Sequence, residues 1–110
     1  MGRRKIFACE PIPRSVTEIV RAICADYPRR QRMISDGEGG DAEKECRRIN
    51  AAVDSALAEV EVGVREILLR DIACGRGYDY SMASAIMVKS SYYRRRNKLI
   101  RDIARQMNLL

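Results

Sequence analysis

The chain of 110 residues contains no histidine, no tryptophan and one phenylalanine. Without histidine it lacks the side chain that most often serves as a general base and as a metal ligand. The sequence also contains no Walker-type phosphate loop, no Gly-x-Ser-x-Gly elbow and no His-Glu-x-x-His motif. These absences predict that the protein is not an enzyme, holds no metal and needs no cofactor.

Acidic side chains are present, but their pattern does not indicate catalysis. They alternate with arginines along the expected helices, which is typical of a solvated helix face. We therefore expect solvent exposure for Glu59, Glu61, Glu66 and Asp71.

Long apolar runs are also missing. No run approaches the roughly 18 residues that a membrane-spanning helix requires. The opening stretch "MGRRKIFACEPIPRS" is basic but lacks the apolar segment of a secretory signal. We therefore expect a soluble cytoplasmic protein without membrane contact.

The four cysteines are too widely separated to form a recognisable metal or disulfide motif. Successive cysteines lie 15, 22 and 28 positions apart, so no C-x-x-C pair occurs. Cys24, Cys46 and Cys74 have apolar neighbours at helical spacing, where a free thiol behaves as a small hydrophobic group. The sequence predicts reduced and mostly buried thiols.

The positive charge of the chain is concentrated near its C-terminus. The whole sequence has 21 basic and 15 acidic residues, a net charge of +6. From Lys89 onward there are seven basic residues and one acidic residue, whereas the preceding 88 residues contain 14 of each. A basic excess confined to one segment is the electrostatic signature of a surface that binds a polyanion.

The apolar residues recur at helical rather than strand spacing, which predicts an all-α fold of five to six helices. Ser15 and Glu18 have the spacing of a capping box, so we expect the first helix to begin at Ser15. Pro28 should end or restart that helix. Its apolar stripe would consist of Val16, Ile19, Val20, Ile23 and Cys24.

The stretch "SDGEGGD" (35–41) predicts a linker, after which Asp41 is expected to cap the next helix. Residues 43–74 carry a helical stripe that either continues through Gly63 or breaks there. Gly75 or Gly77 suits the C-cap of this stretch. Its apolar stripe comprises Cys46, Ile49, Val53, Leu57, Val60, Val64, Ile67, Leu68 and Ile72.

A short helical piece near 80–87 and a long basic helix to about 107 predict a helix-turn-helix at residues 80–107. At about 100° per residue, the long helix divides into two faces. One is an apolar arc that contains Tyr92 and also Arg96. The arc is completed by Leu99, Ile100, Ile103 and Met107.

The opposite face of this helix carries groups that bind phosphates or base edges. Because the N-terminal turns of a recognition helix approach the bases, Ser90, Tyr93, Arg94 and Asn97 are the expected base-edge contacts. Together with these four, the full set of residues expected to contact DNA is Lys89, Ser90, Tyr93, Arg94, Arg95, Asn97, Lys98 and Arg101.

These segments resemble RinA-type phage transcriptional activators and the related ArpU-type regulators. The resemblance covers "INAAVDSALAEVEVGVREILLRDIACGRGY", "DYSMASAIM", "VKSSYYRRRNKLIRDIARQMNL" and, earlier in the chain, "DYPRR". It implies a helix-turn-helix similar to region four of bacterial sigma factors, in a phage or prophage protein that binds promoter DNA. In such proteins the recognition helix often begins with a Ser or Thr cap. The aligned residue is Val88, so the helix begins there or shifts to a cap at Ser90 or Ser91.

Two questions of organisation stay open in the sequence. Residues 1–40 would form an N-terminal helical segment with the Gly-rich linker, and residues 41–110 a DNA-binding domain. The N-terminal helix pair would either form a homodimer seam or pack on residues 43–74. The alternative function is a helical interaction protein, such as a small phage DNA-packaging subunit or a factor that binds RNA polymerase.

Overall fold

The computed structural model describes residues 11–37 and 39–110. Within these ranges the chain is helical and contains no strand, which confirms the all-α prediction. The elements are α1 (Arg14–Ala25), α2 (Tyr27–Asp36), α3 (Gly40–Leu57), α4 (Val62–Cys74), two short 3-10 helices, η2 (Tyr78–Tyr80) and η3 (Met82–Ala85), and α5 (Lys89–Gln106).

The first helix starts earlier than its sequence predicted. α1 begins at Arg14, and the carbonyl of Pro13 accepts the first turn's hydrogen bond from the N–H of Thr17 at 3.0 Å. The predicted capping box is therefore wrong: Ser15 lies inside the first turn, and Glu18 accepts a hydrogen bond from Arg14 instead. The fixed φ of the proline brings the chain into helical geometry before Ser15. Pro28 restarts the chain as α2, as expected.

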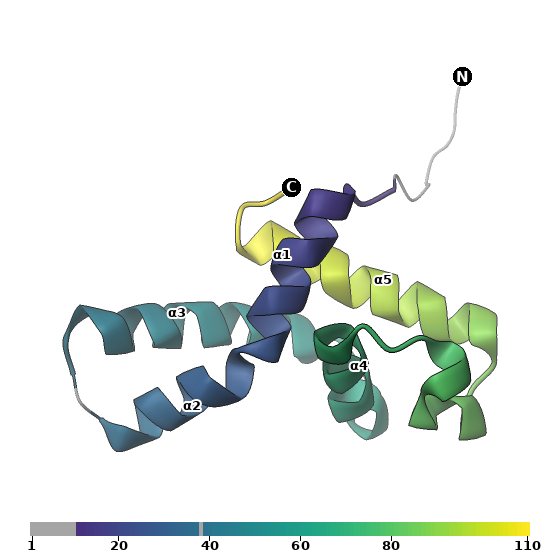
Figure 1. Cartoon of the computed structure of the whole chain (residues 1–110), viewed down its shortest axis with the longest axis horizontal. Helices are drawn as coiled ribbons and strands as arrows, with labels where there is room; N and C mark the ends of the chain where they lie inside the picture. Colours follow the sequence, from purple (N-terminus) through teal and green to yellow (C-terminus); the bar gives the residue numbers. More distant parts are fainter. Residues whose placement is uncertain (1–10, 38) are drawn as a thin grey trace.

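Helices α2 and α3 pack side by side as a hairpin (Figure 1). Gly37 ends α2 in the left-handed region, with φ of 63°. α3 begins at Gly40, so the expected cap at Asp41 is wrong and Asp41 lies in the first turn. The N–H of Gly39 instead donates to the carboxylate of Glu43 at 2.8 Å, because glycines at positive φ let the chain enter the helix two residues earlier.

A buried arginine joins the two helices of this hairpin, which the sequence did not indicate. The guanidinium of Arg30 donates to the side-chain oxygen of Asn50 at 2.6 Å and to the carbonyl of Ile23 at 2.5 Å. Asn50 in turn donates to Gln31 at 2.9 Å. Because both buried polar groups find partners, their burial is tolerated.

The 43–74 stretch is two helices, and the break lies before Gly63. α3 ends at Leu57, α4 begins at Val62, and Gly63 lies within the first turn of α4. Arg65 stabilises the connection by donating to the carbonyls of Val60 at 2.7 Å and Ala58 at 3.3 Å. Gly75 ends α4 with φ of 70°, which confirms the C-cap expected there.

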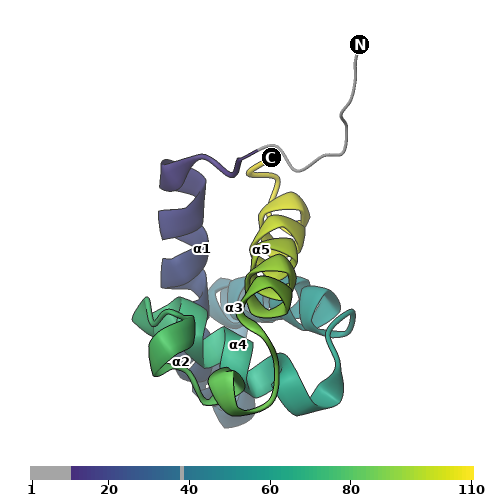
Figure 2. The same ribbon diagram turned by 90° about the vertical axis from the view of Figure 1, so that its right-hand side faces the viewer.

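One hydrophobic cluster unites α1 with α3, α4, η3 and α5. α1 packs against α4 and α5, and in Figure 2 it stands beside α5. Of the two arrangements left open for the N-terminal helix pair, packing within the chain is the one observed. The buried members of this cluster are Val16, Val20, Cys24, Val53, Ala56, Leu68, Ile72, Ala83, Tyr92, Leu99, Ile100, Ile103 and Ala104.

Asp71 is buried, contrary to the expectation of a solvated face. Its side chain faces the core at 1% relative exposure, whereas Glu59, Glu61 and Glu66 are exposed. One carboxylate oxygen of Asp71 accepts hydrogen bonds from the hydroxyls of Ser81 at 2.5 Å and Tyr92 at 2.7 Å. These hydroxyls replace the water that the carboxylate loses on burial.

The short helical piece expected near 80–87 is present as two 3-10 turns rather than as one continuous helix. It consists of η2 and η3, separated by Ser81 in an extended conformation with φ of −95° and ψ of 148°. The Ser81 hydroxyl donates to Asp71 and accepts from the N–H of Ala83 at 3.0 Å. Because these two bonds hold Ser81 in place, the chain turns there instead of continuing as one helix.

The thiol prediction holds for Cys24 and Cys46, which are free and buried, but is wrong for Cys74, which is exposed. At 100° per residue, Cys74 lies about 120° around α4 from the buried Leu68 and about 160° from the buried Ile72. Cys9 lies outside the described residues. No helix in the described part of the chain is long and apolar enough to cross a membrane.

Candidate nucleic-acid interface

The two faces of α5 lie where the helical period placed them. Tyr92, Leu99, Ile100 and Ile103 are buried in the core, and Met107 packs against it. α5 begins at Lys89 after Val88, without a side-chain cap, so neither Ser90 nor Ser91 shifts its start. The N–H of Tyr92 donates to the carbonyl of Val88 at 3.0 Å and closes the first turn.

Five of the eight expected DNA contacts are exposed: Lys89, Ser90, Arg94, Asn97 and Lys98. Arg95 and Arg101 are half-buried. The exposed set spans the first three turns of the helix, the part that enters a DNA groove in known recognition helices.

Tyr93, the remaining expected contact, turns toward the protein. Its hydroxyl accepts a hydrogen bond from the backbone N–H of Tyr78 at 3.1 Å, and its ring meets the Tyr92 ring edge-on at 5.0 Å between centroids. A side-chain carbon at Gly77 would approach the Tyr93 hydroxyl to 3.1 Å. Tyr93 thus connects α5 to the start of η2.

Arg96 also serves the fold rather than the outer face. Its guanidinium donates to the hydroxyl of Tyr92 at 2.8 Å and to the backbone carbonyl of Arg76. Burial raises the pKa of Tyr92, and the hydrogen bond to Asp71 raises it further, while Arg96 acts in the opposite direction. The expected position of Arg96 within the apolar arc is confirmed, and its partners there are a phenol and a backbone carbonyl.

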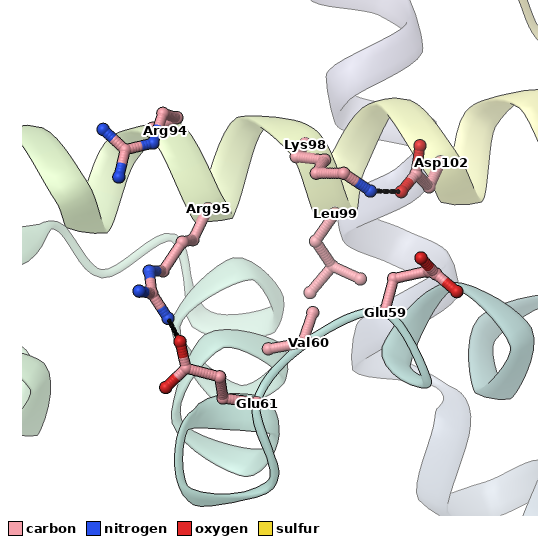
Figure 3. A pocket seen from close by; sticks show the side chains of 8 residues that line it. All are labelled: Glu59, Val60, Glu61, Arg94, Arg95, Lys98, Leu99 and Asp102. Carbon is pink, nitrogen blue, oxygen red and sulfur yellow. Dashed lines mark hydrogen bonds and ion pairs between the residues drawn. The ribbon is translucent and has the colours of Figure 1, made fainter.

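Two basic residues of the candidate interface are engaged by carboxylates (Figure 3). Arg95 pairs with Glu61 at 2.5 Å, and Lys98 pairs with Asp102 at 2.7 Å. The sequence contained no signal for the first pair, because its partners are 34 positions apart. The second has the i, i+4 spacing of a helix pair and was open to prediction.

Arg94 differs from these two residues. Within the described part of the chain it has no ion-pair partner, and in Figure 3 its side chain points away from the carboxylates. Arg94 is therefore the residue of the RRR triplet whose charge is most available to a ligand.

Large apolar side chains are exposed just before α5, which the sequence did not indicate. Tyr80 is 83% exposed, and Met82, Ile86 and Val88 are each more than half exposed. The run "YSMASAIMV" is visible in the sequence, but the short helical piece expected near 80–87 did not indicate which of its side chains face the solvent.

Nothing among the described residues gathers three metal-ligating side chains of the His, Cys, Asp or Glu type. Comparisons with protein-family models, with curated proteins and with solved structures returned no match.

Proposed function

We propose that the protein is a transcriptional regulator of phage or prophage type that binds promoter DNA through α5. The observation that carries this proposal is the polar and basic outer face of α5, where Ser90, Arg94 and Asn97 are exposed near its N-terminal end, together with the exposed first residue Lys89. Arginine and lysine neutralise phosphates or bind guanine, asparagine can bind adenine in a bidentate manner, and serine can donate to phosphate oxygens.

Rigidity of the helix supports this role. The inner face of α5 is buried, and Tyr92 ties it to Asp71 of α4, while Arg96 ties it to the carbonyl of Arg76. A helix fixed on two sides presents its outer groups at a set spacing, which base reading requires.

The proposal includes a helix-turn-helix in which η2 and η3 precede α5 as the recognition helix, similar to region four of sigma factors and to RinA- and ArpU-type regulators. It assigns the protein to the cytoplasm, with double-stranded DNA as its partner and without catalysis or a cofactor. An unbiased selection of bound DNA sequences at near-physiological salt tests it directly. An enriched motif would support base reading, and the absence of any enrichment would contradict it.

Substitutions on α5 give a second test. Arg94→Ala and Lys98→Ala should each weaken DNA binding and reduce the slope of log K against log salt concentration, by about 0.9 for each lost phosphate contact. The larger effect is expected for Arg94, since Lys98 is paired with Asp102. Arg48→Ala, an exposed change on α3, is the control. Salt slopes equal to that of the natural chain in both α5 variants would remove this helix as the DNA contact.

The exposed apolar residues before α5 favour a second candidate, a helical interaction protein. Tyr80, Met82, Ile86 and Val88 would suit a protein surface, either of RNA polymerase or of a phage packaging assembly. Sedimentation of the chain discriminates between the candidates. A homodimer matches a regulator on a two-fold DNA site, whereas a larger closed ring matches a packaging subunit.

A further inference from the structure

A mixed-charge groove runs along one side of α5, between that helix and the connection from α3 to α4 (Figure 3). Its apolar floor contains Val60 and the buried Leu99. Three carboxylates and three bases complete its lining: Glu59, Glu61, Asp102, Arg94, Arg95 and Lys98. On this side of α5, the three bases are therefore matched by three acids.

The carboxylates are placed where they neutralise individual bases. Glu61 projects from the start of α4 and pairs with Arg95 at 2.5 Å, while Asp102 pairs with Lys98 at 2.7 Å. Arg95 is also held by the hydroxyl of Ser91 at 3.3 Å. Glu59 is exposed at the same groove and adds a third negative charge.

These pairs compete with DNA phosphates for the same two bases. A phosphate that approaches Arg95 or Lys98 must displace a carboxylate or lie beside it, and like charges repel. Both pairs are substantially exposed, so neither is strong enough to exclude a well-placed phosphate altogether. Sequence-independent binding depends almost wholly on phosphate contacts, so it loses more from such competition than base-specific binding does.

We propose that Glu61 and Asp102 are specificity determinants that weaken sequence-independent DNA binding by holding Arg95 and Lys98 in ion pairs. The DNA would then be bound mainly through the exposed groups Lys89, Arg94 and Asn97 in the N-terminal part of α5. This inference rests on the proposed function, since it concerns the same surface of α5.

The test compares Glu61→Gln, Asp102→Asn and the double variant with Glu66→Gln, using the full chain and a labelled duplex of mixed sequence. Glu66 is the matched control because it is an exposed acid on α4 that pairs with Arg70 rather than with α5. Each change removes one negative charge, so the long-range effect of net charge is the same in all single variants. Fluorescence anisotropy over a series of salt concentrations gives both affinity and salt slope.

Each single groove variant should bind the mixed-sequence duplex about threefold more tightly, and the double variant up to about tenfold. The salt slope should steepen by about 0.9 for each base released to a phosphate. Glu66→Gln should change affinity by less than about twofold, because exposed charges at a distance are screened. Equal behaviour of the groove variants and Glu66→Gln, or weaker binding by them, would overturn the inference.

The outcome also separates this inference from the proposed function. If neither the natural chain nor any variant binds duplex DNA, both proposals fail. If the natural chain binds DNA and loses affinity on Arg94→Ala, while the groove variants match the control, only the present inference fails. Asp102→Asn gives an independent result should Glu61→Gln disturb the start of α4, which circular dichroism would detect.

Discussion

Tyr92 is the largest side chain that is fully buried in the described part of the molecule. Its ring lies between Tyr78 and Tyr93, with both neighbouring rings meeting it edge-on. Its hydroxyl donates to the carboxylate of Asp71 and accepts from the guanidinium of Arg96. One residue thus fills the core under α5 and hydrogen-bonds two charged groups, Asp71 and Arg96.

Tyr92→Ala should therefore lower the free energy of unfolding by roughly 3–5 kcal/mol, as other buried aromatic truncations do. Tyr80→Ala is the matched control, because Tyr80 is 83% exposed and its loss should change stability by no more than about 0.5 kcal/mol. Urea denaturation followed by circular dichroism measures both. Similar stability losses in the two variants would contradict the burial of Tyr92.

The buried thiol of Cys24 should make the folded protein less stable in alkaline solution. Burial raises the pKa of its thiol from 9.0 to about 12, an effect that Arg30 partly opposes. Above pH 9 the unfolded chain releases this proton while the folded chain keeps it, so the free energy of unfolding falls as pH rises toward 12. The fall should approach about 1.4 kcal/mol per pH unit from this group.

Cys24→Ala should make that decline shallower, when urea denaturation is repeated at several pH values above 9 in the presence of a reductant. Cys74→Ala should leave the decline unchanged, since Cys74 is exposed. Burial also raises the pKa of Tyr27 to about 12. Part of the decline in unfolding free energy should therefore persist above pH 10 in both variants. An identical pH dependence in Cys24→Ala and the natural chain would disprove the assignment.

At the scale of the element, α4 has a glycine near each end, and the two differ in backbone conformation and in their surroundings. Gly75 ends the helix with φ of 70°, and an added side-chain carbon would lie 3.2 Å from the guanidinium of Arg21. Gly63 lies in the first turn without a positive φ, and nothing within 4 Å would contact an added carbon. The same substitution should therefore have opposite effects at the two ends of one helix.

Gly75→Ala is expected to destabilise the protein by roughly 1–2 kcal/mol, the cost of a left-handed conformation for a residue with a side chain. Gly63→Ala is expected to stabilise it by about 0.5 kcal/mol, because alanine reduces the freedom of the unfolded chain. Chemical denaturation of the two variants checks this pair. Destabilisation by Gly63→Ala as large as that by Gly75→Ala would show that the start of α4, where Gly63 lies, is placed incorrectly.

At the scale of the whole molecule, α1 belongs to the same hydrophobic cluster as α4 and α5. Val16, Val20 and Cys24 are buried against residues that follow them by about 30 positions or more. A chain of residues 41–110 alone would expose that apolar surface to water. Burial of apolar area is the main driving force of folding, so a domain that loses one side of its core loses much of its stability.

We therefore expect residues 41–110 alone to lack a cooperative thermal unfolding transition. The control is a chain that lacks only residues 1–10, which should retain the transition because Val16, Val20 and Cys24 of α1 are still present. Circular dichroism during heating measures both chains. A cooperative transition in the 41–110 fragment would instead support the division of the chain at residue 40.

The sequence by itself determined the helical class, an interruption at Pro28, a C-cap at Gly75 or Gly77 and the two faces of α5. Each of these follows from local spacing or from the backbone preference of one residue, and such effects act over a few positions. The inward position of Arg96 was also predictable, since it falls within the apolar arc of its own helix.

Only the tertiary structure decided which distant groups meet. Asp71 has the same local pattern as the exposed acids, yet it is buried because Ser81 and Tyr92 provide its hydrogen bonds. Likewise, the net charge of +6 near the C-terminus does not act alone on α5, since the fold brings Glu61 to Arg95 across 34 positions. Helical periodicity fixes the direction in which a side chain points, but packing between helices fixes what lies in that direction.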